Sequence, residues 1–187
     1  MQSSASRMQL LIEDLLSYTK ILNDDNPFTE VDLNNILEEV LVELKDEIEE
    51  KSSSIEVAKL PIVKGIPFQI RQLFINLVSN SLKFAKSGVP SLITIKTTVM
   101  KDNDMIFLKD KSLSQYHKIT VEDNGIGFSS NYNQDIFKVF HRLHSKQYSG
   151  SGIGLSICKK IAEANGGYIE AIGKEGEGAT FNIYFHE

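Results

Sequence analysis

Three short segments of this chain carry residues that could bind a nucleotide. Residues 76–84 contain two asparagines and a lysine, residues 123–127 contain an aspartate and two glycines, and residues 150–155 contain three glycines. A single glycine cluster marks any turn. Three clusters in this order, each suited to one part of a nucleotide, are a much more specific signal. The chain has no Gly-x-x-x-x-Gly-Lys-Ser/Thr segment, so the pattern predicts an ATP site without a P-loop.

The first segment lies on a predicted helix over residues 67–84. At about 100° per residue, Asn76, Asn80 and Lys83 share one face, and Leu73 and Leu77 lie on the opposite face. Neutral amide oxygens can ligate Mg²⁺ beside a triphosphate, and the lysine can meet a phosphate. The alternative is a solvated amphipathic face, although glutamate and lysine are better helix formers for that purpose than asparagine.

The second segment follows a predicted strand over residues 116–122. Asp123 at its end could accept a hydrogen bond from the exocyclic amine of adenine, whereas guanine presents a carbonyl there. Gly125 and Gly127 would let the backbone approach a flat base closely. An ordinary glycine turn after a strand is the alternative interpretation.

In the third segment Gly150, Gly152 and Gly154 open a predicted helix that ends near Asn165. Free N–H groups and the dipole at a helix N-terminus favour phosphate. The long segment before it could close over a phosphate or be a solvated loop; its cations are Lys138, Arg142, His144 and Lys146. Thr180, which enters the last strand, could reach the base directly or through water, or be an ordinary strand residue.

The composition is that of a globular protein, with 187 residues, 41% of them hydrophobic and 24% charged. A net charge of −5 gives no reason to expect nucleic-acid binding. The single Cys158 cannot form an internal disulfide, and none of the four histidines has metal-ligand spacing. No apolar run approaches the roughly 18 residues of a membrane span. We expect a cytoplasmic fragment, whose full-length protein could be membrane-anchored.

The remaining patterns predict an α/β fold with a mixed, mostly antiparallel sheet and helices on one face. Helices are expected at residues 3–22, 33–50, 67–84 and 152–165, and strands at 28–32, 54–58, 92–99, 116–122, 168–172 and 179–185. Residues 3–22 carry an apolar seam typical of a helical bundle; a core helix is the alternative. A polar break follows, so we divide the chain into residues 1–25 and a catalytic unit over 26–187.

Together these motifs resemble the ATP-binding catalytic domain of sensor histidine kinases, within the superfamily of Hsp90 chaperones and type II topoisomerases. Residues 76–84 resemble its N box, 123–127 its G1 box, 137–140 its F box and 150–155 its G2 box. The segment 178–180 is similar to its final glycine motif. The run from Ile136 to Lys160 is most similar to phytochrome-like and PAS-containing bacterial kinases.

The resemblance implies a two-layer α/β sandwich with a mixed five-stranded sheet and three helices, preceded by an N-terminal bundle helix. It implies that the domain binds ATP together with Mg²⁺, and that Asn80, assisted by Asn76, holds the metal. The residues it assigns to catalysis are Asn76, Lys83 and Arg142, and those assigned to the nucleotide are Asn80, Phe84, Asp123, Gly125, Ile126, Gly127, Gly150, Gly152, Gly154, Leu155 and Thr180.

The resemblance also implies a reaction, in which the γ-phosphoryl of ATP passes to a histidine and then to an aspartate of a response-regulator receiver domain. Residues 3–22 would be the second helix of the dimerisation and phosphoacceptor hairpin, through which the full-length protein forms a homodimer. No histidine precedes His117, so we expect the acceptor upstream of this fragment. A nucleotide-binding adaptor and a serine kinase of the anti-sigma-factor type are the alternatives.

Overall fold

The computed structural model describes residues 12, 19, 27–101, 115–143, 148 and 150–186 of the chain. The elements in these ranges are β1 (Thr29–Asp32), α2 (Leu33–Glu43), α3 (Lys45–Glu50), β2 (Ser54–Val57), β3 (Ile62–Gly65), α4 (Pro67–Lys83), β4 (Leu92–Lys101), β5 (Gln115–Asp123), α5 (Gly154–Ala164), β6 (Tyr168–Lys174) and β7 (Gly178–His186). The short 3₁₀ helices η2 (Ser130–Tyr132) and η3 (Asp135–Phe137) lie between β5 and α5.

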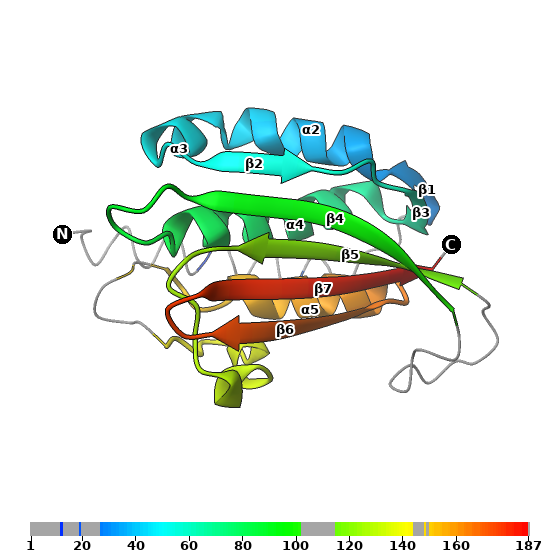
Figure 1. Ribbon diagram of the computed structural model, residues 1–187. Coiled ribbons are helices and arrows are strands. Elements are labelled where there is room, and N and C mark those ends of the chain that lie inside the picture. Colours follow the sequence, from blue (N-terminus) through cyan, green and yellow to red (C-terminus); the bar gives the residue numbers. More distant parts are fainter. Residues whose placement is uncertain are drawn as a thin grey trace.

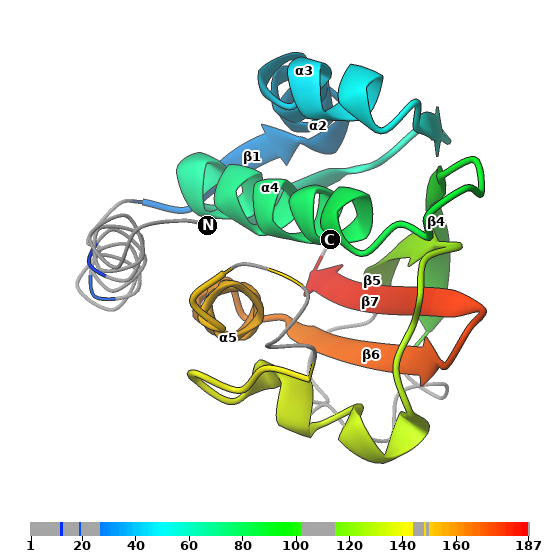
Figure 2. The same cartoon turned by 90° about the vertical axis from the view of Figure 1, so that its left-hand side faces the viewer.

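The main sheet has five strands in the order β2-β4-β5-β7-β6. Strand β2 runs parallel to β4, and the other neighbours are antiparallel. Helices α4 and α5 cover one face of this sheet, and no helix of the described residues lies on the other face (Figures 1 and 2). The fold is therefore the predicted two-layer α/β sandwich with a mixed five-stranded sheet.

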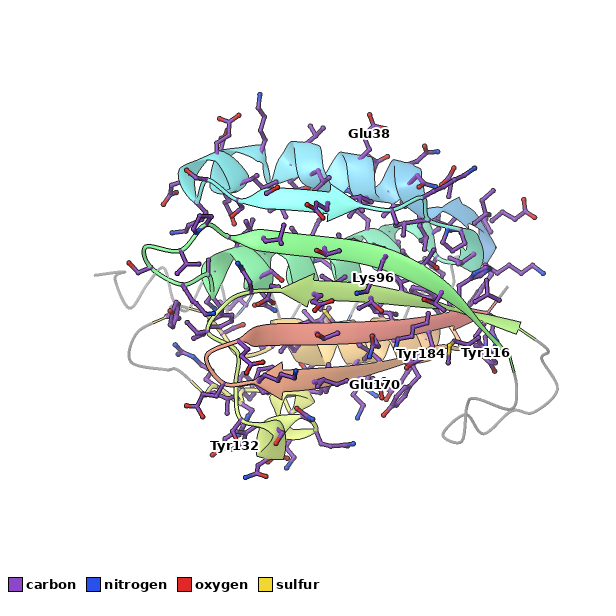
Figure 3. All side chains as sticks on the ribbon, viewed as in Figure 1. Glu38, Lys96, Tyr116, Tyr132, Glu170 and Tyr184 are labelled. Carbon is purple, nitrogen blue, oxygen red and sulfur yellow. The ribbon has the colours of Figure 1, made fainter. Side chains whose placement is uncertain are left out.

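The core lies between these two helices and the sheet. Its fully buried side chains come from alternate positions of the central strands and from one face of each helix: Leu73, Phe74, Leu77, Ile93, Ile95, Ile119, Val121, Ile157, Ile161 and Ile183. The polar side chains of Lys96, Glu170 and Tyr184 lie on the face of the sheet without helices (Figure 3). Inward and outward positions alternate along each strand, as the pleat requires.

Two details differ from the sequence predictions. The helix expected over residues 33–50 is divided at Leu44, whose ψ of 9° leaves the helical range. A short strand, β3, was not predicted; it pairs antiparallel with β1 in a separate two-stranded sheet. Its four residues alternate between exposed and buried, as in a strand. Because the pattern is so short and is flanked by Pro61 and Pro67, the sequence of this strand is easily mistaken for a loop.

The predicted bundle helix over residues 3–22 and the proposed boundary at residue 25 lie outside the described residues, apart from Ile12 and Thr19, which are helical and exposed. Within the described part of the chain, no helix is both long enough and apolar enough to span a bilayer.

A buried polar network joins the end of α5 to the start of α4. Asn165 is 1% exposed; its Oδ1 accepts from the N–H of Ile66 at 2.8 Å, and its Nδ2 donates to Oε1 of Gln69 at 2.8 Å. Its Nδ2 also donates to the carbonyl of Ile161 at 2.8 Å. This network holds the two helices in a fixed relation, and with them the two sides of the site described below.

Replacing this asparagine should therefore destabilise the fold. We expect Asn165→Ala to lower the free energy of unfolding by about 2–4 kcal/mol, because it leaves buried donors and acceptors unpaired. Urea unfolding followed by circular dichroism would measure the change. The exposed Asn35 of α2 supplies the control, since Asn35→Ala should change stability by no more than about 0.5 kcal/mol. Equal effects of the two variants would contradict the structural role of the network.

Candidate nucleotide site

A cavity of about 260 Å³ lies between α4, the start of α5, the ends of β5 and β7, and the segment that precedes α5. Its lining along α4 is mostly polar, and its apolar side chains come mainly from the other elements. The lining residues are Asn76, Ser79, Asn80, Lys83, Phe84, Asp123, Gly127, Phe128, Ile136, His141, Arg142, Leu143, Tyr148, Gly150, Ser151, Gly152, Gly154, Leu155, Ala179 and Phe181. The structure thus brings residues of all three sequence clusters to one cavity.

Helix α4 contributes Asn76, Asn80 and Lys83 to the cavity from a face that adjoins the face of its buried leucines. The oxygen of Asn76 adjoins the start of α5, since a Cβ at Gly154 would lie 3.7 Å from its Oδ1. Two amide oxygens one helical turn apart are suitable ligands for Mg²⁺, which prefers oxygen and keeps several waters. No group of three histidine, cysteine or carboxylate side chains in the described residues could hold a metal. A metal here would depend on these amides and on the phosphates of a ligand.

Lys83 extends from the last turn of α4 toward the glycine-rich segment. Its Nζ lies 4.8 Å from the centre of the Phe84 ring. A Cβ at Gly150, whose φ is +138°, would lie 2.7 Å from the same Nζ. Glycine is therefore favoured at this position by its backbone conformation, and the flexible ammonium group of Lys83 lies directly beside it.

Asp123 lies at the end of β5, where its carboxylate faces the cavity. Oδ1 accepts from the N–H of Gly125 at 2.9 Å and from that of Ala179 at 3.3 Å. The hydroxyl of Ser81 lies 3.2 Å from Oδ2 and 3.1 Å from the carbonyl of Leu77, and it can donate to only one of them at a time. Burial raises the pKa of Asp123, and these three donors oppose that shift. A ligand donor would favour the charged form further.

Two predicted glycines have a different role from the one expected. A Cβ at Gly125 would lie 2.5 Å from the carbonyl oxygen of Phe84 and 2.8 Å from Oδ1 of Asp123. Gly127 has a φ of +61°, and a Cβ there would collide with the carbonyl of Lys174. The close approach at both positions is therefore made by the protein's own backbone, and only Gly127 lines the cavity.

Helix α5 begins at Gly154, so Gly150 and Gly152 belong to the segment before it. The N–H of Phe140 donates to the carbonyl of Gly152 at 3.0 Å and closes the base of this segment. Arg142 lines the cavity and donates from Nη2 to the carbonyl of Tyr148 at 2.6 Å.

Of the other predicted cations of this segment, Lys138 is described, and it does not line the cavity. Lys138 is exposed and pairs with Asp135 at 2.6 Å. The predicted residues His144 and Lys146 lie outside the described part of the chain.

Thr180 was wrongly assigned to the base-binding wall, because it does not line the cavity. Its neighbours Ala179 and Phe181 do, and successive residues of a strand point to opposite faces. Ile126 does not line the cavity either; its N–H donates to the carbonyl of Phe84 at 2.9 Å and positions the turn. In the sequence, the apolar residues of the last strand occupy odd-numbered positions, which predicts that the odd-numbered side chains face the interior. This alternation could have identified Ala179, rather than Thr180, as a lining residue of the cavity.

Besides Ala179 and Phe181, seven lining residues were not assigned to the site from the sequence: Ser79, Phe128, Ile136, Ser151, His141, Leu143 and Tyr148. The last three lie in the segment before α5. No local pattern distinguishes them, because the segment that carries them has no regular periodicity. Cys158 is fully buried behind the site, and burial raises the pKa of its thiol to about 12. It is therefore protonated at neutral pH and is not a nucleophile.

Comparison with known families agrees with this geometry. The sequence profile of the histidine kinase-, DNA gyrase B- and HSP90-like ATPases matches residues 65–187. The chain belongs to this family. The match begins just before α4 and includes every residue that lines the cavity.

Several relatives are histidine kinases. The chain is 36% identical over 180 residues to the phytochrome-like protein Cph1 of Synechocystis, covering 96% of this chain and 22% of that protein. It is similar to full-length ShkA in complex with AMPPNP, with a TM-score of 0.72, 24% identity, and 97% and 36% of the two chains covered. It is also similar to histidine kinase ThkA in complex with the response regulator TrrA, with a TM-score of 0.69, 22% identity, and 97% and 48% covered.

These two structural likenesses show a shared fold. The sequence match carries the relationship to the catalytic, ATP-binding domain of sensor histidine kinases. The chain spans about a fifth of the length of its phytochrome-like relatives.

The carboxylate of Asp123 should be required for binding of adenine nucleotides. We expect Asp123→Asn to weaken binding by roughly 1.5–3 kcal/mol, because the acceptor that faces the ligand becomes an amide donor. The carbonyl of the new side chain can still accept from Gly125 and Ala179, so the fold should persist. Calorimetric titration with a non-hydrolysable ATP analogue would measure the loss. An unchanged affinity would mean that the base lies elsewhere.

The same residue should make binding depend on pH. The raised pKa of Asp123 means that its carboxylate takes up a proton at a higher pH than an ordinary aspartate. If binding needs the charged form, affinity is complete above this pKa and falls as the pH is lowered through it. Titrations at several pH values should show this loss in the wild type and a flatter profile in Asp123→Asn. Parallel profiles would contradict the assignment.

Proposed function

We propose that this chain is the catalytic part of a sensor histidine kinase, which binds ATP with Mg²⁺ and transfers the γ-phosphoryl group to a histidine. One observation carries the proposal: two amides, an ammonium group and a buried carboxylate face one cavity. Amides and ammonium suit a metal-bound triphosphate, and the carboxylate suits an amine of the base.

The residues of the cavity then have distinct roles. Asp123 accepts from the adenine amine, and Asn80, assisted by Asn76, holds the metal. Lys83 and Arg142 neutralise phosphate charge. Backbone N–H groups of the glycine segment and of the start of α5 receive the remaining phosphate oxygens, at Gly150, Gly152 and Gly154. Phe84 and Leu155 supply apolar contact. The bound metal would neutralise charge that develops on the transferred group.

Transfer to a protein group is favoured over hydrolysis by the nature of residue 76. Hydrolases that resemble this family use a glutamate there as a general base for water. An asparagine amide cannot take a proton, so water is not activated from this position. Among the described lining residues the only carboxylate is Asp123, and we assign it to the base. The catalytic contribution is therefore positioning and charge neutralisation.

The partners follow from the same proposal. The phosphoacceptor histidine would lie in a hairpin helix that pairs with residues 3–22, and two such hairpins would form a homodimer. A response-regulator receiver domain would take the phosphoryl group onto an aspartate. The named complex of ThkA with TrrA supports this partner class, and the AMPPNP bound to ShkA supports ATP. Because ATP is supplied in the cytoplasm, we place the activity there.

The metal-binding amide should be needed for transfer rather than for folding. We expect Asn80→Ala to reduce labelling of a separately supplied acceptor hairpin from a phytochrome-like relative by at least about 100-fold, since it removes a ligand of the metal that stabilises the transferred group. The melting temperature should change little, because the Asn80 side chain faces the cavity. Radiolabelled ATP with acid and base treatment of the product would measure the label. The exposed variant Asn35→Ala is the control.

The chemical stability of the label distinguishes the three candidate functions. Acid-labile, base-stable label on the hairpin supports a histidine kinase. Acid-stable label on serine would establish the serine-kinase alternative, and binding without any label would favour a nucleotide-binding adaptor. If Asn80→Ala fails to fold, the polar face of α4 has been assigned wrongly.

A further inference from the structure

The side-chain amide of Asn76 has one end at the cavity and the other in the core. The residue lines the cavity, yet its Nδ2 is buried and forms no regular hydrogen bond in the described part of the chain. Its Oδ1 adjoins Gly154, another residue of the cavity lining. The nitrogen therefore points toward the interior, and the oxygen is the atom available to a ligand.

The polar group beside this nitrogen is the thiol of Cys158, in the second turn of α5. Burial raises the pKa of this thiol, and interaction with the Asn76 side chain opposes the rise. The contact falls short of a regular hydrogen bond, as expected of sulfur, which is a weak acceptor. Because Cys158 is completely buried in the main core cluster, water does little to screen this contact.

The thiol can act only as an acceptor toward Asn76, because its proton is directed elsewhere. Sγ of Cys158 donates to the carbonyl of Leu73 at 3.8 Å. With the S–H aimed at this carbonyl, the sulfur presents its lone pairs to the amide. An N–H of the amide is therefore favoured beside the sulfur over the amide oxygen. Leu73 precedes Asn76 by about one turn of α4, so one helix carries both groups that the thiol contacts.

The reverse orientation of the amide would be unfavourable at both ends. Its oxygen would meet the lone pairs of the sulfur, and its NH₂ group would face the position proposed for Mg²⁺. An amide oxygen ligates this cation, whereas an N–H donor repels it. Nε2 of Gln72 lies 3.5 Å from Oδ1 of Asn76 and favours the observed orientation. At this distance the bond is weak and leaves the oxygen available to a metal.

We propose that Cys158 is a positioning residue for the metal site, whose sulfur holds the amide of Asn76 with its oxygen toward the cavity. The inference rests on the proposed function, in which Asn76 assists Asn80 in binding Mg²⁺. Cys158 does not line the cavity and takes no part in phosphoryl transfer. It favours metal binding because an amide that is already oriented need not be ordered when the metal arrives.

Two substitutions of similar size separate the polar role of Cys158 from its packing. Cys158→Ala and Cys158→Ser leave similar space in the core and differ by one hydroxyl group, which can accept from the amide of Asn76. A third variant, Cys158→Val, fills the space without supplying an acceptor. Calorimetric titration of each folded protein with a non-hydrolysable ATP analogue, first in Mg²⁺ and then in EDTA, would measure affinity with and without the metal.

Loss of the acceptor should weaken the metal-assisted binding alone. We expect Cys158→Ala and Cys158→Val to bind the analogue about three- to tenfold more weakly in Mg²⁺, as for the loss of one modest hydrogen bond, and within about twofold of the wild type in EDTA. Cys158→Ser should stay within about twofold of the wild type in both conditions. The matched control is Ile161→Val, which alters another completely buried side chain of α5 and should leave both affinities unchanged.

The outcomes separate this inference from the proposed function. Wild-type affinity of Cys158→Ala or Cys158→Val in Mg²⁺ would overturn the positioning role and leave the proposed function standing. Equal losses in Mg²⁺ and EDTA would also overturn it, because the effect would then be a general loosening of the core. An equal loss in Cys158→Ser and Cys158→Ala would do the same. A wild type that gains no affinity from Mg²⁺, or that does not bind the analogue, would overturn both proposals.

Discussion

Helix α4 must bury one face in the core while an adjacent face lines the cavity. Leu73, Phe74 and Leu77 are completely buried, and Asn76 and Asn80 line the cavity from an adjacent face of the helix. A rotation of the helix about its axis would expose the leucines and bury amides without partners, and both changes are costly. Core packing therefore fixes the direction in which the amides of Asn76 and Asn80, the proposed metal ligands, point, and the remaining parts of the cavity are arranged around them.

Asp123 connects this helix to the sheet. Its carboxylate joins Ser81 of α4, the turn at Gly125 and the start of β7 through hydrogen bonds. A half-desolvated carboxylate is unfavourable by itself, and the raised pKa expresses that cost. A donor on a bound base would relieve it. The same residue thus holds three elements together, and under the proposed function its carboxylate would also accept from the bound base.

The segment before α5 forms a further part of the cavity wall, to which it contributes Arg142 and Tyr148. The described contacts of this segment include the bond from the N–H of Phe140 to the carbonyl of Gly152 and the ring contact of Tyr148 with Phe84. The buried network of Asn165 fixes the two helices on which this segment rests.

The sequence by itself determined α4 and its two faces, the strand that ends at Asp123, and the order of the glycine clusters. These features follow from periodicity and from residue types within a few consecutive positions. Only the tertiary structure decided that Gly125 and Gly127 make room for the protein's own backbone, and that Tyr148 meets Phe84. Each of these depends on how segments far apart in the chain approach one another. Strand register and side-chain direction set that approach, and no local pattern of residues encodes it.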